Sequence, residues 1–375
     1  MSSVVGRGVV GRPVVGRTVV GRTVVGWYVH HHGAGHVTRF LAVRPHLDAV
    51  VVVFSSMPEP AVLPADTTWV LLPRDDEPVV DVDGVSHRPE DASPTARGFL
   101  HWAPLGHPGH TRRLAAIAAS LAECRFGAFV VDVSVEVTLF VRLLGVPPIV
   151  VSQPGDRSDA PHRLAYDAAE RILAPWSESM HPSPALERHR ERVRWVGGIS
   201  RWDAGAGAGA GSRAGSRAAL DGGTVLVLGG GAAGDGSAPT LADRVDAAAG
   251  VTPHLSWSIL GATASTWVAD PSDALRRADV VVSAAGQNSI ADLAAVGARA
   301  IVVPQERPFG EQAATAHALR TAGLAVTVDT WPQTADWPAL IARARSLDPD
   351  WSLWGVDGAA QRAADVIAEV VAWRG

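Results

Sequence analysis

Short runs of aliphatic and β-branched residues alternate with amphipathic stretches along the first half of the chain. The apolar runs predict buried strands at 24–30, 49–54, 68–72, 128–133 and 148–152. Helical periodicity predicts helices at 111–124, 135–144 and 162–172, and residues 74–110, rich in Pro, Asp and His, are typical of a loop. Strands that alternate with helices in this way indicate a parallel sheet with crossover helices.

The second half of the chain repeats this alternation. Its predicted strands lie at 224–228, 255–260, 279–283, 300–303 and 325–328. Its predicted helices lie at 239–249, 289–296, 311–321 and 358–373. We therefore expect an α/β protein with two open-sheet domains, which bind ligands at the carboxyl ends of their strands.

Low-complexity segments set the predicted domain limits. Val-Val-Gly-Arg recurs every five residues near the start, which predicts a disordered extension; the alternative is a basic arm for an anionic membrane surface. Alternating Ala and Gly from residue 204 predict a flexible linker. The predicted units are an extension (1–26), a first domain (27–203), a linker (204–222), a second domain (223–357) and a helix (358–375) that packs back on the first domain.

Composition excludes several classes of protein. The chain has no lysine, so its 33 basic residues are all arginine, and Schiff-base pyridoxal-phosphate enzymes, P-loop proteins and protein kinases are excluded. A net charge of −5 disfavours a nucleic-acid partner. Cys124 is the only cysteine, which fits a reducing cytoplasm and excludes an internal disulfide. No apolar run reaches the ~18–20 residues of a transmembrane helix, so we expect at most peripheral contact with the inner face of the membrane.

The loop that follows the first strand is the first candidate site. Gly33, Ala34 and Gly35 allow a tight turn and close approach of a ligand, although Arg39 stands where a dinucleotide fingerprint has its last glycine. His36 can act as a general base or bind an acceptor phosphate; the alternative is a histidine that stabilises the turn. A metal site with His32, four residues earlier, is disfavoured because no acidic residue lies nearby.

Acidic residues at strand exits of the first domain are further candidates for the acceptor side. Asp132 lies at the end of the fourth predicted strand, Glu136 follows it, and Asp156 follows the fifth. Each can assist proton transfer, whereas Asp132 is equally well explained as a helix cap.

Three loops of the second domain have the composition of a site for a charged ligand. Gly229, Gly230, Gly231 and Ala232 follow a strand, so their amides can bind a diphosphate; the alternative is a plain flexible loop. The next loop runs through Ala285, Gly286, Gln287, Asn288 and Ser289 into a helix that carries Asp292. Asn288 or Ser289 can cap that helix, and Asp292 can either bind ribose hydroxyls or complement the helix dipole. In the third loop, the side chains of Gln305, Glu311 and Gln312 can form hydrogen bonds with sugar hydroxyls. The alternative is that the acid only stabilises the start of a helix and the amide is solvated.

In this order and spacing, these loops resemble the GT-B glycosyltransferases of the peptidoglycan UDP-N-acetylglucosamine transferase type, with a family 28 C-terminal domain. The likeness is strongest from Ala278 to Gly323, where Ala278-Asp279-Val280-Val281-Val282 leads through Gly286 to Ile290-Ala291-Asp292-Leu293 and then to Ile301-Val302-Val303-Pro304. Gly33-Ala34-Gly35-His36-Val37 and Gly229-Gly230-Gly231-Ala232-Ala233 are similar to the family's other glycine loops.

The resemblance implies two Rossmann-like, doubly wound parallel-sheet domains that face each other across a cleft. It implies an inverting, metal-independent transfer of N-acetylglucosamine or a related hexose from a UDP-sugar, which is a co-substrate, with no other cofactor. The acceptor is lipid-linked, a glycan or a small molecule. His36, Asp132 and Glu136 would be catalytic, and Gly33–Gly35 would form the acceptor-side loop. The donor residues would be Gly229, Gly230, Gly231, Ala232, Trp267, Val268, Ala285, Gly286, Gln287, Asn288, Ser289, Asp292, Gln305, Glu311 and Gln312.

Three positions depart from the family pattern. Asp292 replaces a glutamate, Glu311 replaces a glutamine, and Ala284 replaces an arginine. These differences indicate a related but distinct sugar or acceptor. Alternatives are a UDP-sugar epimerase of the same fold, an NAD-dependent oxidoreductase and a non-catalytic sugar-nucleotide-binding protein.

Overall fold

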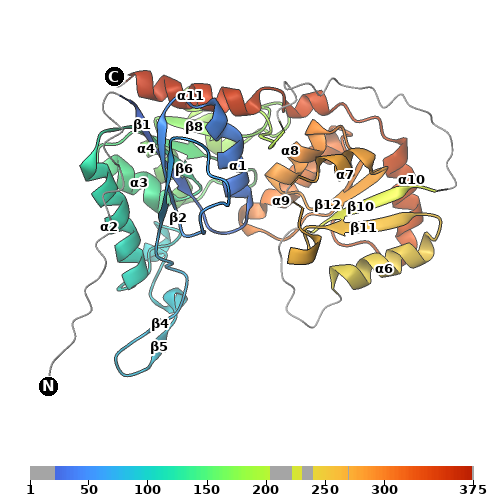
Figure 1. Cartoon of the computed structure of the whole chain (residues 1–375), viewed down its shortest axis with the longest axis horizontal. Helices are drawn as coiled ribbons and strands as arrows, with labels where there is room; N and C mark the ends of the chain where they lie inside the picture. The colour runs from blue at the N-terminus through green and yellow to red at the C-terminus, as the bar shows by residue number, and fades with distance from the viewer. Residues whose placement is uncertain (1–21, 203–221, 230–239, 269, 374–375) are drawn as a thin grey trace.

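The computed structural model describes residues 22–202, 222–229, 240–268 and 270–373. Figure 1 shows two α/β domains side by side, with a long C-terminal helix across the first. Most of the predicted extension and of the predicted linker lies outside the described residues. The same holds for residues 230–239, which include most of the glycine-rich loop. The predicted domain limits and cytoplasmic location stay predictions. No helix in the described ranges has the length and apolarity to cross a membrane.

The first domain is built on a parallel sheet of seven strands. Its strands are β1 (Val24–Val29), β2 (Val50–Ser55), β3 (Thr67–Leu71), β6 (Phe126–Asp132), β7 (Pro148–Val151), β8 (Arg171–Ala174) and β9 (Val193–Trp195), in the order β3-β2-β1-β6-β7-β8-β9. All six residues of β1 are buried, because helices cover both faces of the sheet. Gly26 is required in β1, since a Cβ atom there would lie 2.3 Å from the ring of Phe129. The helices are α1 (Gly35–Val43), α2 (Pro108–Glu123), α3 (Val135–Leu143), α4 (Ala160–Ala168) and α5 (Pro184–Glu187).

The second domain has a parallel sheet of five strands. They are β10 (Thr224–Leu228), β11 (Ser256–Leu260), β12 (Val280–Ser283), β13 (Ala300–Val302) and β14 (Val326–Thr327), in the order β11-β10-β12-β13-β14. The accompanying helices are α6 (Leu241–Val251), α7 (Ser272–Arg277), α8 (Gln287–Ala295), α9 (Glu311–Thr321) and α10 (Trp337–Ser346). Both domains are therefore doubly wound. Their strand order reverses between β1 and β6 and between β10 and β12, and such reversals create the crevices in which ligands bind.

The last helix, α11 (Ala359–Trp373), belongs spatially to the first domain. Its apolar face joins the hydrophobic cluster around β1 and β6 that includes Val25 and Trp27. Arg362 of α11 donates hydrogen bonds to the carbonyl of Val196 at 2.7 and 2.9 Å. The chain thus crosses back to the first domain after the second, so the two domains are joined by two connections (Figure 1).

Two predicted elements differ from the structure. The predicted helix at 162–172 is wrong in its second half, because α4 ends at Ala168 and residues 171–174 form β8. Ala169 takes an extended conformation, and the apolar side chains of Ile172 and Leu173 are buried in the sheet. The helix cap expected at Asn288 or Ser289 is also wrong, since α8 already begins at Gln287 after Gly286.

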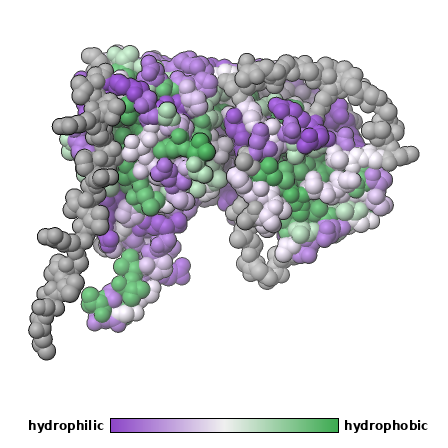
Figure 2. All heavy atoms as spheres, viewed as in Figure 1, coloured by the Kyte–Doolittle hydropathy of each residue, from purple (hydrophilic) through white to green (hydrophobic). Residues whose placement is uncertain are grey.

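The predicted loop at 74–110 projects from the first domain as an arm. It carries the short hairpin of β4 (Val79–Val80) and β5 (Ser86–His87). Figure 2 shows apolar atoms gathered at its tip, where Val80, Val82 and Val85 are exposed. His101, near the end of this arm where it rejoins the domain, lines the cavity between the two domains.

Candidate active site

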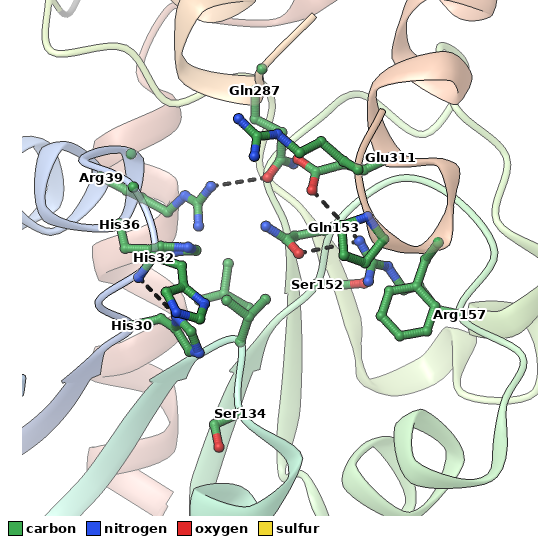
Figure 3. A pocket seen from close by; sticks show the side chains of 18 of the residues that line it. His30, His32, His36, Arg39, Ser134, Ser152, Gln153, Arg157, Gln287 and Glu311 are labelled. Atoms are coloured by element: carbon green, nitrogen blue, oxygen red, sulfur yellow. Dashed lines mark hydrogen bonds and ion pairs between the residues drawn. The ribbon is translucent and has the colours of Figure 1, made fainter. Parts of the chain in front are cut away.

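A cavity of about 750 Å³ lies between the two domains, at the carboxyl ends of their strands. The first domain contributes residues from the ends of β1, β6 and β7 and from α1 and α4, and the second contributes the loops before α8 and α9. Of the predicted site residues, those that line the cavity are Gly33, Gly35, His36, Gly286, Gln287, Asn288, Ser289, Gln305, Glu311 and Gln312. Figure 3 shows side chains from both domains converging on this space.

His36 and Asp132 form a buried pair at the switch point of the first sheet. His36 lies in the first turn of α1 and Asp132 is the last residue of β6; His36 Nδ1 lies 2.9 Å from Asp132 Oδ1. Burial raises the pKa of the Asp132 carboxyl, but Arg39 and His36 outweigh burial and hold that pKa below its ordinary value. The carboxylate therefore stays ionised and orients the imidazole, whose Nε2 is left to act on a ligand in the cavity.

Backbone strain is found at two positions of this cavity. Val133, which follows Asp132, has a φ of 58°, and Phe309 has a φ of 62°. A positive φ in a residue with a bulky or branched side chain costs on the order of 1–3 kcal/mol and often marks a functional site. The strain at Val133 fixes the direction in which the chain leaves Asp132.

Glu136 has a different position. Its Oε1 accepts hydrogen bonds from the backbone amides of His101 at 2.7 Å and Trp102 at 3.0 Å. Its Oε2 accepts a hydrogen bond from Ser134 Oγ at 3.1 Å. Glu136 does not line the cavity. Its carboxylate anchors the root of the arm, so the geometry favours His36 over Glu136 as a base.

The amino end of α8 is open to the cavity. Gly286 is the N-cap residue, no side chain caps the helix, and the first turn has no acidic residue. Gly286, Gln287, Asn288 and Ser289 all line the cavity. The first amides of a helix have no partner within it, and the helix dipole places partial positive charge there, so this end can bind an anion.

The loop before α8 and the loop before α9 are both hydrogen-bonded to one glutamine side chain. Gln312 Oε1 accepts hydrogen bonds from the amides of Ala285 at 3.1 Å and Gln305 at 2.8 Å. The side-chain amide nitrogen of Gln312 stays available to a ligand. The neighbouring carboxylate of Glu311 lies 3.7 Å from the guanidinium of Arg157, which belongs to the first domain. These contacts bring the second domain's predicted sugar-binding residues against the first domain.

Asp292 does not line the cavity. Its Oδ1 accepts a hydrogen bond from Ser200 Oγ at 2.6 Å, and its Oδ2 accepts one from Arg201 Nε at 3.0 Å. Burial raises the pKa of Asp292 above its ordinary value, against the lowering effect of Arg201 and Ser200. A ribose can use this carboxylate only if Ser200 and Arg201 release it.

The remaining predicted donor residues lie outside the cavity lining. Gly229 packs closely on Ala262, where a Cβ atom would lie 2.5 Å away, and Gly230, Gly231 and Ala232 lie outside the described residues. Trp267 is 68% exposed and Val268 is 44% exposed, so both lie at the surface. Ala285 is fully buried and contributes to the site through its amide.

An aromatic cluster that the sequence analysis did not predict joins the two domains at the cavity. The ring of Phe309, from the second domain, lies 4.8 Å from that of His162 and 5.2 Å from that of His101. The guanidinium of Arg157 lies 4.6 Å from the Phe309 ring. Burial lowers the pKa of His162 to about 4, although Asp159 acts in the opposite direction. Of the three rings, only Phe309 lies in a loop that the sequence had marked as a candidate site, the one that follows the predicted strand at 300–303.

Two groups of side chains in the described ranges can hold a metal ion. They are His31, His32 and Asp76, and His101, Asp159 and His162, each with ligand atoms within 4.8 Å of one another. In the first, Asp76 already bonds both imidazoles and Arg74. In the second, Asp159 bonds both imidazoles. In each group the carboxylate is thus paired with both imidazoles without an ion, and His36 belongs to neither group. The expectation that no acidic residue lies near His32 is wrong, because Asp76 Oδ2 lies 3.2 Å from His32 Nε2.

Comparison with known proteins adds family information for one part of the chain. Residues 260–334 match the glycosyltransferase family 28 C-terminal domain. The UDP-N-acetylglucosamine--N-acetylmuramyl-(pentapeptide) pyrophosphoryl-undecaprenol N-acetylglucosamine transferase of Paenarthrobacter aurescens (strain TC1) is 36% identical over 102 residues. That match covers 25% of this chain and 27% of the relative. The corresponding protein of Clavibacter sepedonicus is 37% identical over 110 residues, which cover 27% of this chain and 30% of the relative. The match thus spans less than a third of these relatives.

Solved structures extend the likeness to the whole fold. The glycotransferase of kitacinnamycin superposes with a TM-score of 0.59 at 17% identity, over 93% of this chain and 99% of the other. MurG of Acinetobacter baumannii superposes with a TM-score of 0.56 at 15% identity, also over 93% and 99%. The rhamnosyltransferase SpnG of spinosyn is a further match, with a TM-score of 0.54. The predicted architecture of two doubly wound domains across a cleft is confirmed.

Proposed function

We propose that this chain, which has the GT-B fold and carries a glycosyltransferase family 28 C-terminal domain at residues 260–334, transfers a sugar from a nucleotide diphosphate to an acceptor hydroxyl. In its finer form, the proposal is an inverting, metal-independent transfer of N-acetylglucosamine or a related hexose from UDP. One observation carries it. His36, which is hydrogen-bonded to the buried Asp132, and the uncapped amino end of α8 line the same cavity.

His36 is the proposed general base. Its Nε2 takes the proton of the acceptor hydroxyl while the hydroxyl oxygen forms a bond to the anomeric carbon of the sugar. The carboxylate of Asp132, 2.9 Å from Nδ1, stabilises the imidazolium that results. General-base catalysis supplies about 10²–10⁴-fold, so the larger share of the acceleration has to come from stabilising the leaving group.

The amino end of α8 is the proposed site of the leaving diphosphate. As the bond between the sugar and the diphosphate breaks, its electron pair moves onto the phosphate oxygen, and charge develops there. The free amides at the start of α8 and the guanidinium of Arg307 in the cavity wall favour that charge. Attack from the side opposite the diphosphate inverts the anomeric carbon, which agrees with a base and an anion site on different domains.

Sugar recognition is assigned to the start of α9. The oxygen of the Gln312 side chain is occupied by two backbone amides. Its amide hydrogens are therefore the groups that it can donate to sugar hydroxyls. Glu311, held near Arg157, offers carboxylate oxygens to further hydroxyls. The N-acetylglucosamine transferases that match this part of the chain support a hexosamine, and the replacement of a glutamine by Glu311 supports a sugar different from theirs.

A panel of donors tests the proposal. Thermal denaturation with UDP-N-acetylglucosamine, UDP-glucose, dTDP-glucose and GDP-mannose should show stabilisation by one of them, because a ligand bound only to the folded state raises its stability. With the stabilising donor, release of the nucleoside diphosphate should require His36. The variant His36→Asn should lose it, and His46→Asn, which alters an exposed histidine bonded to Gln361, should not.

Three outcomes would contradict the proposal. One is that no nucleotide sugar changes the melting temperature. Another is that His36→Asn turns over at the wild-type rate. The third is that proton NMR shows an epimeric UDP-sugar formed without any acceptor, which would favour an epimerase of the same fold.

A further inference from the structure

Arg39 joins the two domains at the cavity, and the proposed mechanism gives it no role. It lies one helical turn after His36 on α1 and is 3% exposed. Its Nη1 donates to Asp132 Oδ1 at 2.6 Å, and its Nη2 donates to Gln287 Oε1 at 2.9 Å. Figure 3 shows Arg39 and Gln287 meeting across the cavity. One guanidinium therefore connects the carboxylate that orients His36 to the first residue of α8.

The geometry of this bridge depends on arginine. A guanidinium presents its hydrogens in a rigid planar fork, so fixing one hydrogen bond also fixes the direction of the other. Asp132 Oδ1 accepts from both Arg39 and His36, so a movement of Arg39 changes the acceptor of the imidazole. An ammonium group has the same charge but no rigid fork.

The bridge is incomplete by itself. Three buried atoms of the bridge have no hydrogen-bond partner among the residues that the structure describes: Arg39 Nε, Asp132 Oδ2 and Gln287 Nε2. Buried polar atoms without partners are rare, since each lost hydrogen bond with water is unfavourable. Gln287 Nε2 belongs to the side chain that opens α8, where the diphosphate is proposed to bind, so an oxygen of that ligand is a suitable acceptor for it.

We propose that Arg39 is a positioning residue that transmits nucleotide binding at α8 to the orientation of His36. This inference rests on the proposed function. A diphosphate oxygen accepts a hydrogen bond from Gln287 Nε2 and fixes the amide, so that Gln287 Oε1 holds Arg39. Arg39 then holds Asp132, and Asp132 holds the imidazole. The base is thus fully ordered only when the donor is bound, which is a coupling between two sites through one element.

The direct test follows the His36 imidazole by ¹H–¹⁵N NMR while UDP is added to the full chain. The His36 signal is assigned by its loss in His36→Asn. In the wild type, UDP should shift this signal. At saturating UDP the shift should disappear in both Gln287→Met and Arg39→Gln. Calorimetry should show UDP affinity within about threefold of the wild type for Arg39→Gln, which makes no contact with the ligand, and about tenfold weaker for Gln287→Met, which loses one hydrogen bond to the diphosphate while the amides of α8 remain. In turnover, both variants should lower kcat about 10–100-fold, as expected for a lost hydrogen bond to a charged group.

Two further variants separate positioning from simple structural or charge effects. Asn288→Ala removes the other hydrogen bond from the start of α8 to α1, which Asn288 Nδ2 donates to the carbonyl of Gly35 at 2.7 Å, and it should keep the UDP-dependent shift. Arg39→Lys keeps the charge but not the fork, and it should behave like Gln287→Met. A wild-type response to UDP in either bridge variant, or in Arg39→Lys, overturns the inference. Calorimetry of the wild type tests the proposed function separately. If the wild type binds no nucleotide, the proposed function is refuted, and the inference that rests on it is refuted too.

Discussion

Replacing Asp132 by Asn separates the catalytic and structural roles of the buried pair. The substitution keeps the size of the side chain and removes its charge. Two consequences follow from the structure. His36 loses the carboxylate that fixes its Nδ1–H, because an amide nitrogen can now face the ring. Arg39, 3% exposed, loses its only carboxylate contact among the described residues and keeps its hydrogen bond to Gln287.

The magnitudes of the two effects differ. Loss of an oriented base should lower kcat by about 10²–10⁴-fold. Leaving a buried guanidinium without its carboxylate should lower the free energy of unfolding by about 3–5 kcal/mol, a large part of the ~5–15 kcal/mol typical of a folded protein. We expect Asp132→Asn to remain folded at 20 °C with a clearly lowered melting temperature.

A double variant tells the two effects apart. Adding Arg39→Met removes the unpaired charge, so Asp132→Asn with Arg39→Met should regain much of the melting temperature and none of the turnover. The assays are thermal denaturation and release of the nucleoside diphosphate from the donor found by the panel. If Asp132→Asn keeps kcat within threefold of the wild type while its melting temperature falls, the carboxylate serves only stability and the proposed role of the pair is refuted.

Three further predictions concern other parts of the molecule. Burial lowers the pKa of His162 to about 4, so as pH falls from about 6.5 to 4 this histidine binds a proton in the unfolded chain before it does in the folded protein. The melting temperature should therefore fall over that pH range. The variant His162→Gln should flatten this dependence, and an unchanged slope would contradict the argument. Gly26→Ala places a methyl 2.3 Å from the Phe129 ring, and urea denaturation should show a free energy of unfolding lowered by ~1–3 kcal/mol, as is typical of overpacking. Gly250→Ala, where the added methyl meets open space, should be neutral or stabilising, and equal urea midpoints for the two variants would refute the packing argument. Gln312→Ala leaves two loop amides without their acceptor, at about 1–3 kcal/mol each, and should weaken donor binding in calorimetry; an unchanged dissociation constant would show that the loops hold their shape without it.

The sequence alone determined the strands of the two large sheets, except β8 and β9, and the loops that follow them. Runs such as Val24–Val29 and Val280–Ser283 are apolar without interruption because both faces of a parallel strand are buried, and this pattern is local. The carboxyl ends of these strands therefore located the first candidate loop, and His36 in it, correctly within the cavity. Where local signals conflict, as at residues 171–172, the periodicity predicted a helix, but the segment forms part of strand β8.

Only the tertiary structure decided which candidate side chains meet. Asp132 lies 96 residues from His36, and Gln287 lies 248 residues from Arg39, so no spacing in the chain encodes either contact. The same holds for Asp292, whose carboxylate is occupied by Ser200 and Arg201, and for Glu136, which anchors the arm. A sequence specifies which polar groups exist. Whether each is free to bind a ligand depends on long-range packing, because most buried polar groups form hydrogen bonds with partners that the fold brings near.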